Sequence, residues 1–212
     1  MEQKGELEAY CLSKNKFAVG VDEVGRGCLA GPVVAAAVLL DYAKLFSLED
    51  KSRVLIRDSK TLSSKQRDKI LPIIKEITLS YSVAEASVED IELLGIVGAT
   101  FAAMTKALNK ISHPYDIVLT DGNQCIPGLL KPQKAIIKGD SLVYAIAAAS
   151  IIAKQTRDQA MCDLEKEYPE YGFGTHVGYG TKKHMDALNE FGVTPIHRKN
   201  FAPVRKIIER HT

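Results

Sequence analysis

The stretch FAVGVDEVGRGCLAGPVVAAAVLL, residues 17–40, contains two short apolar runs joined by a glycine-rich connection. The runs cover residues 17–21 and 33–40, and each is bounded by glycine, proline or charged residues. Apolar runs of this length with such boundaries predict strands. Because the connection is short, the two strands can pair as antiparallel neighbours.

Two adjacent acids, Asp22 and Glu23, end the first run. Burying a carboxylate without a partner is costly, so these acids either mark the exposed end of a strand or belong to a functional site. Adjacent side chains on a strand point to opposite faces. Asp22 and Glu23 can therefore share a metal ion only if the strand has ended or bulged, or if Glu23 contributes its backbone carbonyl.

A glycine-flanked arginine, Gly25-Arg26-Gly27, follows the two acids. Glycines let the backbone come close to a ligand, and the N–H groups that they leave exposed suit phosphate. An acid pair of the kind that binds metal thus stands next to a loop of the kind that binds phosphate. This combination indicates chemistry on a phosphodiester.

The composition is that of an ordinary globular protein. Of 212 residues, 46% are hydrophobic and 25% charged, which suits one domain with or without a small appendage. The formal net charge of +2 gives no general argument for nucleic acid. From residue 196 onward, however, the chain has one acid, Glu209, and five basic residues: Arg198, Lys199, Arg205, Lys206 and Arg210. This segment is either a patch that binds a nucleic-acid backbone or the solvated face of a helix.

The cysteines and the hydropathy pattern bear on the compartment. Cys11, Cys28, Cys125 and Cys162 form no CxxC pair and do not have the spacing of a zinc site. We find no signal peptide and no apolar run of membrane-spanning length. These features favour a reduced, cytoplasmic protein without membrane contact.

Periodicity and turn residues predict the remaining elements. Further strands are expected at residues 78–86, 116–120 and 134–138, and helices at 2–13, 89–94, 97–111, 141–166, 175–190 and 202–210. Another helix starts after Ser63, a good N-cap, and is frayed or kinked at Pro72. Three strands with short connections come first, and helices and two more strands follow. This order predicts a mixed sheet with helices on its faces.

Acids end three of the strand-like segments: Asp22 and Glu23, then Asp121, then Asp140. If they meet at one edge of the sheet, four carboxylates cannot all stay ionised without a counter-charge. Mg2+ or Mn2+ would supply it, because both prefer oxygen ligands. Two such ions can stabilise both the attacking and the leaving oxygen of a phosphodiester.

These motifs resemble a known family. DEVGRG with AGPVVAAAV, VLTDGN, and KGDSLVYAIAAASIIAK resemble bacterial ribonuclease HII, the type 2 ribonuclease H, over residues 17–204. The GRG loop and the short leader favour type 2 over the related type 3 enzymes. The resemblance implies a ribonuclease H-like α/β fold with a mixed five-stranded sheet, its first three strands antiparallel, flanked by helices. Residues 1–170 are then the catalytic domain, and residues 171–212 a C-terminal helical extension that packs on it and contacts nucleic acid.

The resemblance also implies site residues. Asp22, Glu23, Asp121 and Asp140 match the catalytic acids, which would ligate two Mn2+ or Mg2+ ions. The matching substrate-binding positions are Gly25, Arg26, Gly27, Ser59, Lys60, Lys154, Tyr179 and Arg198.

Each match has a plainer structural interpretation. Ser59-Lys60 also fits the start of a helix. Lys154 either faces phosphate or pairs with a carboxylate. Tyr179 is either a residue that stacks on nucleic acid or a packed surface tyrosine. Asn200 is a mild departure, since serine is more usual at its position in the family motif.

The implied activity is hydrolysis of the RNA strand of RNA–DNA hybrids and incision 5′ of single ribonucleotides in duplex DNA. It leaves 3′-hydroxyl and 5′-phosphate ends, and the Gly25-Arg26-Gly27 backbone would read the ribose 2′-hydroxyl. Two other classes are a nucleic-acid-binding protein without catalysis and another metal nuclease of this fold, such as a junction resolvase. The four acids disfavour the first, and the GRG loop with Tyr179 disfavours the second. A monomer is expected.

Overall fold

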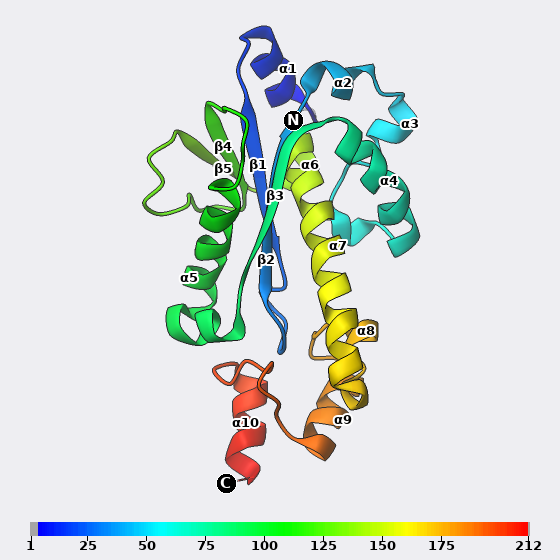
Figure 1. Ribbon diagram of the computed structural model, residues 1–212, viewed down its shortest axis with the longest axis vertical. Helices are drawn as coiled ribbons and strands as arrows, with labels where there is room; N and C mark the ends of the chain where they lie inside the picture. Colours follow the sequence, from blue (N-terminus) through cyan, green and yellow to red (C-terminus); the bar gives the residue numbers. More distant parts are fainter. Residues whose placement is uncertain (1–3, 212) are drawn as a thin grey trace.

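The computed structural model describes residues 4–211, and its centre is one five-stranded sheet (Figure 1). The strands are β1 (Ala18–Val24), β2 (Val33–Leu40), β3 (Thr78–Ala86), β4 (Ile117–Asp121) and β5 (Gln133–Ile136). Their order is β3-β2-β1-β4-β5. The first three pair antiparallel, whereas β4 and β5 run parallel to β1. The predicted mixed sheet is therefore confirmed, with β1 at its centre.

Helices cover both faces of this sheet. They are α1 (Glu6–Ser13), α2 (Tyr42–Ser47), α3 (Asp50–Arg53), η1 (Ser59–Thr61), α4 (Ser64–Glu76), α5 (Val88–Leu108), α6 (Gly139–Leu142), α7 (Tyr144–Glu167), η2 (Pro169–Tyr171), α8 (Phe173–His176), α9 (Lys182–Phe191) and α10 (Ala202–His211). Figure 1 shows α7 on one face and α5 on the other, with α9 and α10 at the C-terminal end of the molecule.

The long helix α7 lies close to β1 because the facing residues are small. A Cβ atom on Gly20 would lie 2.2 Å from the carbonyl carbon of Ala145, so no larger residue fits in β1 at this crossing. Even-numbered residues of β1 face α7, as Ala18 and Val24 do, and Val19 and Val21 pack on the α5 side. The two faces thus have separate apolar cores, and the side of β1 on which a residue lies determines its surroundings.

Helix α5 covers the two helices predicted at residues 89–94 and 97–111, with a kink between them. By length and composition alone its 21 residues could cross a membrane, although no apolar run of that length was expected from the sequence. Gly95, with φ of 69°, interrupts the helix where the sequence predicts a stop. Ile91, Ala99 and Met104 pack against the sheet, as the residues of a core helix do.

Some element boundaries differ from those predicted. Helix α1 begins at Glu6, and the first residues of the predicted helix lie outside the described part. Strand β1 continues past Asp22 to Val24. Helix α4 contains Pro72 without ending there. The helix expected at residues 175–190 is two helices, because Val177 adopts a left-handed φ of 43° between α8 and α9.

The C-terminal segment packs on the strand connection that holds the GRG loop. Leu29 and Ala30 share an apolar cluster with residues of α7, α9 and α10. Ala30 also forms an isolated antiparallel bridge with His197. The division at residue 170 remains a prediction, but these contacts bring the segment after it against residues 25–32.

Candidate active site

The topology of the sheet brings the predicted acids together. Strands β1 and β4 are parallel, with Val21 opposite Thr120, so Asp22 and Asp121 follow at the same edge. Parallel strands of an open α/β sheet form ligand sites at their carboxyl ends. Strand β5 ends nearby, and Lys138, with a left-handed φ of 56°, turns the chain into α6 and presents Asp140 in its first turn.

Three carboxylates form the centre of the site. One carboxylate oxygen from each of Asp22, Asp121 and Asp140 lies within 4.8 Å of the others. Asp22 and Asp140 are buried. Burial raises the pKa of Asp22 well above its ordinary value, and the charges of Glu23 and Asp121 raise it further. Burial, followed by the charge of Asp121, also raises the pKa of Asp140. Hard oxygen donors that crowd and repel one another fit a divalent cation.

Short hydrogen bonds orient these carboxylates. The amide of Glu23 donates to Asp22 Oδ1 at 2.7 Å, and the amide of Gly139 donates to Asp121 Oδ1 at 2.7 Å. The Ser141 hydroxyl lies 3.4 Å from Asp140 Oδ1. Because two of the three carboxylates are held by backbone amides, their positions follow from the fold rather than from flexible side chains.

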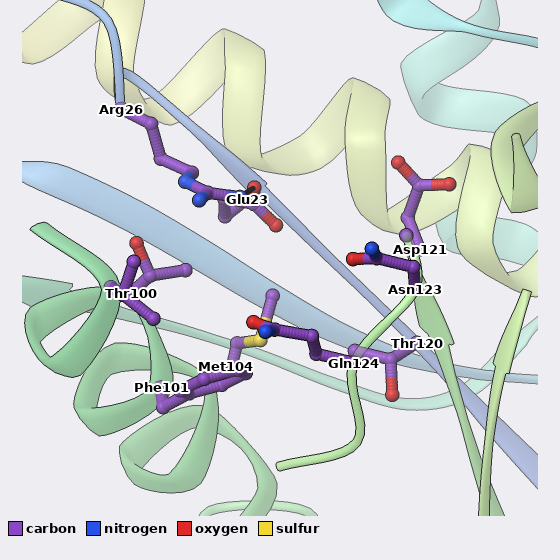
Figure 2. A pocket seen from close by; sticks show the side chains of 11 residues that line it. Glu23, Arg26, Thr100, Phe101, Met104, Thr120, Asp121, Asn123 and Gln124 are labelled. Carbon is purple, nitrogen blue, oxygen red and sulfur yellow. Dashed lines mark hydrogen bonds and ion pairs between the residues drawn. The ribbon is translucent and has the colours of Figure 1, made fainter. Parts of the chain in front are cut away.

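Glu23 is not one of the three clustered carboxylates. Since β1 extends to Val24, Glu23 lies on the α5 side of the strand, opposite to Asp22, as strand alternation requires. Its carboxylate accepts from Arg26 Nη1 at 3.1 Å, and Figure 2 shows the Arg26 side chain extending toward it. Burial raises the pKa of Glu23, and Arg26 opposes this increase. Glu23 and Asp121 both line a small pocket beside α5.

Ser59 and Lys60 approach the carboxylates from the side of the sheet opposite to Glu23. Asp58 caps η1 by accepting from the Lys60 amide at 2.9 Å. The buried Ser59 hydroxyl lies 2.8 Å from that of Ser150 on α7, which itself stabilises the charged form of Asp22. Burial lowers the pKa of Lys60, but the neighbouring carboxylates, Asp22 first among them, raise it by more. Lys60 is therefore a charged group beside the cluster.

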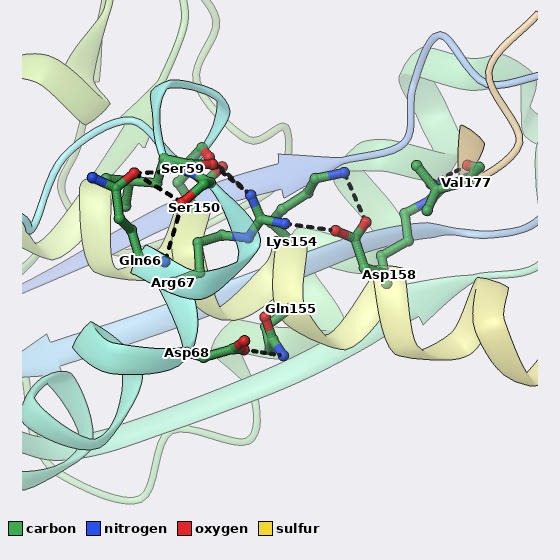
Figure 3. Close-up of polar contacts among 12 residues, drawn as sticks. Ser59, Gln66, Arg67, Asp68, Ser150, Lys154, Gln155, Asp158 and Val177 are labelled. Carbon is green, nitrogen blue, oxygen red and sulfur yellow. Dashed lines mark hydrogen bonds and ion pairs between the residues drawn. The ribbon is translucent and has the colours of Figure 1, made fainter. Parts of the chain in front are cut away.

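In this structure Lys154 contacts a carboxylate, and its contact with phosphate stays a prediction. Its Nζ lies 2.7 Å from Asp158, one turn further along α7, and Asp158 also accepts from Arg67 Nη2 at 3.0 Å (Figure 3). The Lys154 side chain is mostly buried. Its ammonium also lies 6.0 Å from the centroid of the Tyr179 ring. Lys154 thus pairs with a carboxylate and lies near the Tyr179 ring.

Tyr179 lies in the turn between α8 and α9, next to Gly178, which has φ of 84°. Its side chain is 39% exposed, so part of the ring is available to a ligand. The Tyr179 amide donates to the His176 carbonyl at 2.9 Å, and its own carbonyl lies 3.0 Å from His184 Nδ1. The backbone is therefore fixed, although the ring is accessible.

Arg198 is placed differently from the sequence-based expectation. Its side chain is 0% exposed, and its guanidinium donates to the carbonyls of Gly31 and Arg26. A direct contact with a phosphate does not fit this placement. The neighbouring basic residues Lys199 and Arg205 are exposed, and Arg205 lies 3.8 Å from Glu209.

Arg157 was not among the predicted site residues. It is buried in α7, and a Cβ atom on Gly25 would lie 2.2 Å from its Nε. This approach, with a φ of 93° at Gly25, explains why glycine is needed there. The only sequence signal was an arginine one turn beyond the Ala-rich part of α7, which is not specific.

The fold and the three carboxylates together define a ribonuclease H-like hydrolase. A model of the family described as Ribonuclease HII matches residues 19–204. The chain belongs to the ribonuclease HII family. It is accordingly a nuclease with ribonuclease H activity on RNA–DNA hybrids, in a family that depends on divalent metal.

Individual relatives agree with this assignment. The chain is 48% identical to the ribonuclease HII of Burkholderia lata over 92% of its own length and 87% of the relative. It is 47% identical to that of Dechloromonas aromatica, over 88% and 91%. Among solved structures, ribonuclease H2 from Pyrococcus horikoshii OT3 matches with a TM-score of 0.73 at 26% identity, covering 92% of this chain and 98% of the other.

Proposed function

We propose that this ribonuclease H incises duplex DNA on the 5′ side of a single embedded ribonucleotide, in addition to cutting RNA–DNA hybrids. The observation that carries the proposal is the position of the Gly25-Arg26-Gly27 loop. It directly follows β1, whose Asp22 belongs to the carboxylate cluster. A loop that would recognise one 2′-hydroxyl lies next to the groups that would act on the adjoining phosphodiester.

The proposed metal ligands are Asp22, Asp121 and Asp140, with Glu23 contributing from the other face of β1 through its backbone carbonyl or a moved side chain. We propose Mn2+ or Mg2+, two ions during the reaction, because all the donors are oxygens. When bound, these ions would supply an activated water and stabilise the charge on the leaving oxygen. Lys60 adds a positive charge that favours the phosphate.

The chain's own residues determine which bond breaks. The water gives up a proton as its oxygen joins the phosphorus, the bond to the 3′-oxygen breaks, and that oxygen takes up a proton. The products carry a 3′-hydroxyl and a 5′-phosphate. Tyr179, held by its backbone and partly exposed, would stack on the sugar of the neighbouring deoxynucleotide. Such stacking favours a DNA residue on one side of the cut. We also propose that the protein works as a monomer in the cytoplasm.

The test is an incision assay on a labelled duplex that contains one ribonucleotide, with an all-DNA duplex and a long RNA–DNA hybrid as comparisons. Each substrate is incubated with Mg2+, with Mn2+ and with a chelator. The proposal expects one cut, 5′ of the ribonucleotide, only with metal, and no cut in all-DNA. Cleavage of the hybrid without cleavage at the lone ribonucleotide would refute it, and cleavage of a four-way junction would favour the resolvase alternative.

A further inference from the structure

Two buried arginines lie beneath the GRG loop. Arg157 comes from α7 and Arg198 from the segment before α10, and both side chains are 0% exposed. Within residues 4–211, neither guanidinium has a carboxylate partner at ion-pair distance. A buried charge requires compensation. Here the backbone carbonyls of the loop and its surroundings provide it.

The hydrogen bonds of Arg198 join the GRG loop to Gly31, four residues beyond it. Nε and Nη2 donate to the Gly31 carbonyl at 3.0 and 2.8 Å, and Nη1 donates to the Arg26 carbonyl at 2.9 Å. Arg157 donates to the carbonyls of Pro32, Val177 and Ala30, at 3.0, 2.8 and 3.0 Å. A planar guanidinium with several donors can hold two carbonyls in a fixed relation, whereas a lysine ammonium presents a single point of contact.

The bond to Arg26 has a consequence on the other side of the loop. A peptide unit is planar and trans, so the N–H of the next residue points opposite to the C=O. Because Arg198 holds the Arg26 carbonyl toward the protein interior, the Gly27 N–H faces away from it. That N–H has no acceptor among the described residues, and a Cβ atom on Gly27 would have no atom within 4 Å apart from its chain neighbours. A free, oriented donor therefore lies on the exposed side of the loop.

We infer that Arg198 is a positioning residue, which fixes the Arg26–Gly27 peptide so that the loop can bind the 2′-hydroxyl of a ribonucleotide. This inference rests on the proposed function. It assigns Arg198 a role in sugar discrimination and none in binding phosphate. An unpaired donor that meets a hydroxyl is satisfied, but it stays unpaired against deoxyribose, so the fixed peptide favours the ribonucleotide.

The experiment measures binding, apart from turnover. In an Asp140→Asn background without divalent ion, the Kd is measured for a duplex with one ribonucleotide and for the same duplex in all-DNA form, at several salt concentrations. The Kd for the all-DNA duplex divided by the Kd for the duplex with one ribonucleotide reports discrimination. The slope of log Kd against log salt reports phosphate contacts. The variants are Arg198→Met and Arg198→Lys. Leu188→Ala, a buried residue of the same C-terminal core, serves as a matched destabilised control.

We expect both Arg198 variants to lower the ratio about fivefold, the equivalent of one hydrogen bond, with an unchanged salt slope. Leu188→Ala should keep the ratio. Arg198→Lys preserves the charge, so it remains informative if Arg198→Met does not fold. A ratio retained in either folded variant would overturn the inference. A slope that falls by about one in Arg198→Met would overturn it too, because Arg198 would then neutralise a phosphate.

The two proposals fail in different ways. A ratio of one in the Asp140→Asn parent would overturn the role assigned to the loop, even if the unmodified protein cuts at lone ribonucleotides. Conversely, absence of incision by the unmodified protein, with a ratio that still depends on Arg198, would overturn the proposed function and leave the positioning role standing.

Discussion

The Nε2 atoms of His184 and His197 lie 3.1 Å apart in the core beneath Tyr179. The Thr194 amide donates to His197 Nδ1 at 3.0 Å, so the His197 proton is on Nε2 and points at His184. His184 then carries its proton on Nδ1 and donates to the Tyr179 carbonyl at 3.0 Å. This chain of hydrogen bonds requires both imidazoles to be neutral.

Stability should fall in mild acid because of this pair. Burial lowers the pKa of both His184 and His197 to about 4, from an ordinary value of 6.5. The unfolded chain therefore binds more protons between those values, and the free energy of unfolding decreases as the pH falls from about 6.5 toward 4. Urea unfolding at pH 7.0, 6.0 and 5.0 measures this decrease.

The comparison variant is His197→Gln, which removes one of the two titrating groups. Its free energy of unfolding should drop by about 1–2 kcal/mol less between pH 6.5 and 5 than that of the parent, because the acids titrate alike in both proteins. An equal drop in parent and variant would show that the histidines do not titrate in this range.

A second prediction concerns Glu8, a buried acid of α1. Its Oε1 accepts from the Ala145 amide at 3.1 Å, in the first turn of α7. Burial raises the pKa of Glu8, and the backbone amides of α7 oppose this increase. Glu8→Ala should lower the free energy of unfolding by about 1–2 kcal/mol, because the α7 amide then has no cap. Glu8→Gln keeps an acceptor and removes the buried charge, so it should cost less.

The Glu8 measurement is urea unfolding of the parent and both variants at pH 5.0, 6.0 and 7.5. Since the raised pKa means that ionised Glu8 is disfavoured in the folded state, the stability of Glu8→Gln relative to the parent should increase as the pH rises from the ordinary value of 4.5 toward neutrality. Equal losses in the alanine and glutamine variants would contradict the capping role.

A third prediction concerns the carboxylate cluster. Asp22→Asn keeps the shape of the side chain and removes a charge, so cleavage should fall by at least about a hundredfold while hybrid binding is kept. In the presence of a chelator at pH 7.5, the same change should raise the melting temperature of the protein. Burial and the neighbouring carboxylates disfavour ionised Asp22 in the folded state. Turnover close to that of the parent in Asp22→Asn, Asp121→Asn or Asp140→Asn would refute the carboxylate site.

How far the sequence predicts this structure depends on whether the determining contact is local. The bounds of β2 and β3 are those predicted, since alternation and flanking glycine or proline are local features. The convergence of Asp22, Asp121 and Asp140 followed from acids at strand ends together with the family resemblance. Glu23 lies on the other face of β1 from Asp22, as the alternation of side chains on a strand predicts.

Non-local contacts account for what the sequence did not predict. Arg198 reads as one of several basic residues near the C-terminus, and only the fold brings the carbonyls of Arg26 and Gly31 to it. The break before α9 depends on Val177, a β-branched residue in a left-handed conformation that no local pattern favours. Helix α5 has a membrane-like composition because it covers an apolar sheet.

A fourth prediction concerns the exposed basic residues that follow Arg198. Lys199 and Arg205 are expected to contact phosphates without reading sequence. The double variant Lys199→Gln, Arg205→Gln should weaken binding to hybrid and DNA duplexes alike, and it should reduce the salt slope by about 0.9 for each phosphate that is no longer neutralised. Lys51→Gln, at an exposed lysine next to Glu49, is the control. A slope equal to that of the parent would show that Lys199 and Arg205 belong only to a solvated face.

The last prediction concerns Tyr179 as the residue that detects the RNA–DNA junction. Its backbone is fixed by His176 and His184, so removing the ring should leave the turn in place. Stacking on one nucleotide contributes about 1–3 kcal/mol, so Tyr179→Ala should slow incision at a lone ribonucleotide about 5–150-fold. A long RNA–DNA hybrid offers many registers and no required deoxynucleotide, and its cleavage should slow less. The measurement is the ratio of the two rates in the variant, the parent and Tyr10→Ala, an exposed tyrosine of α1. Equal slowing on both substrates would make Tyr179 a general support for the duplex and not a reader of the junction.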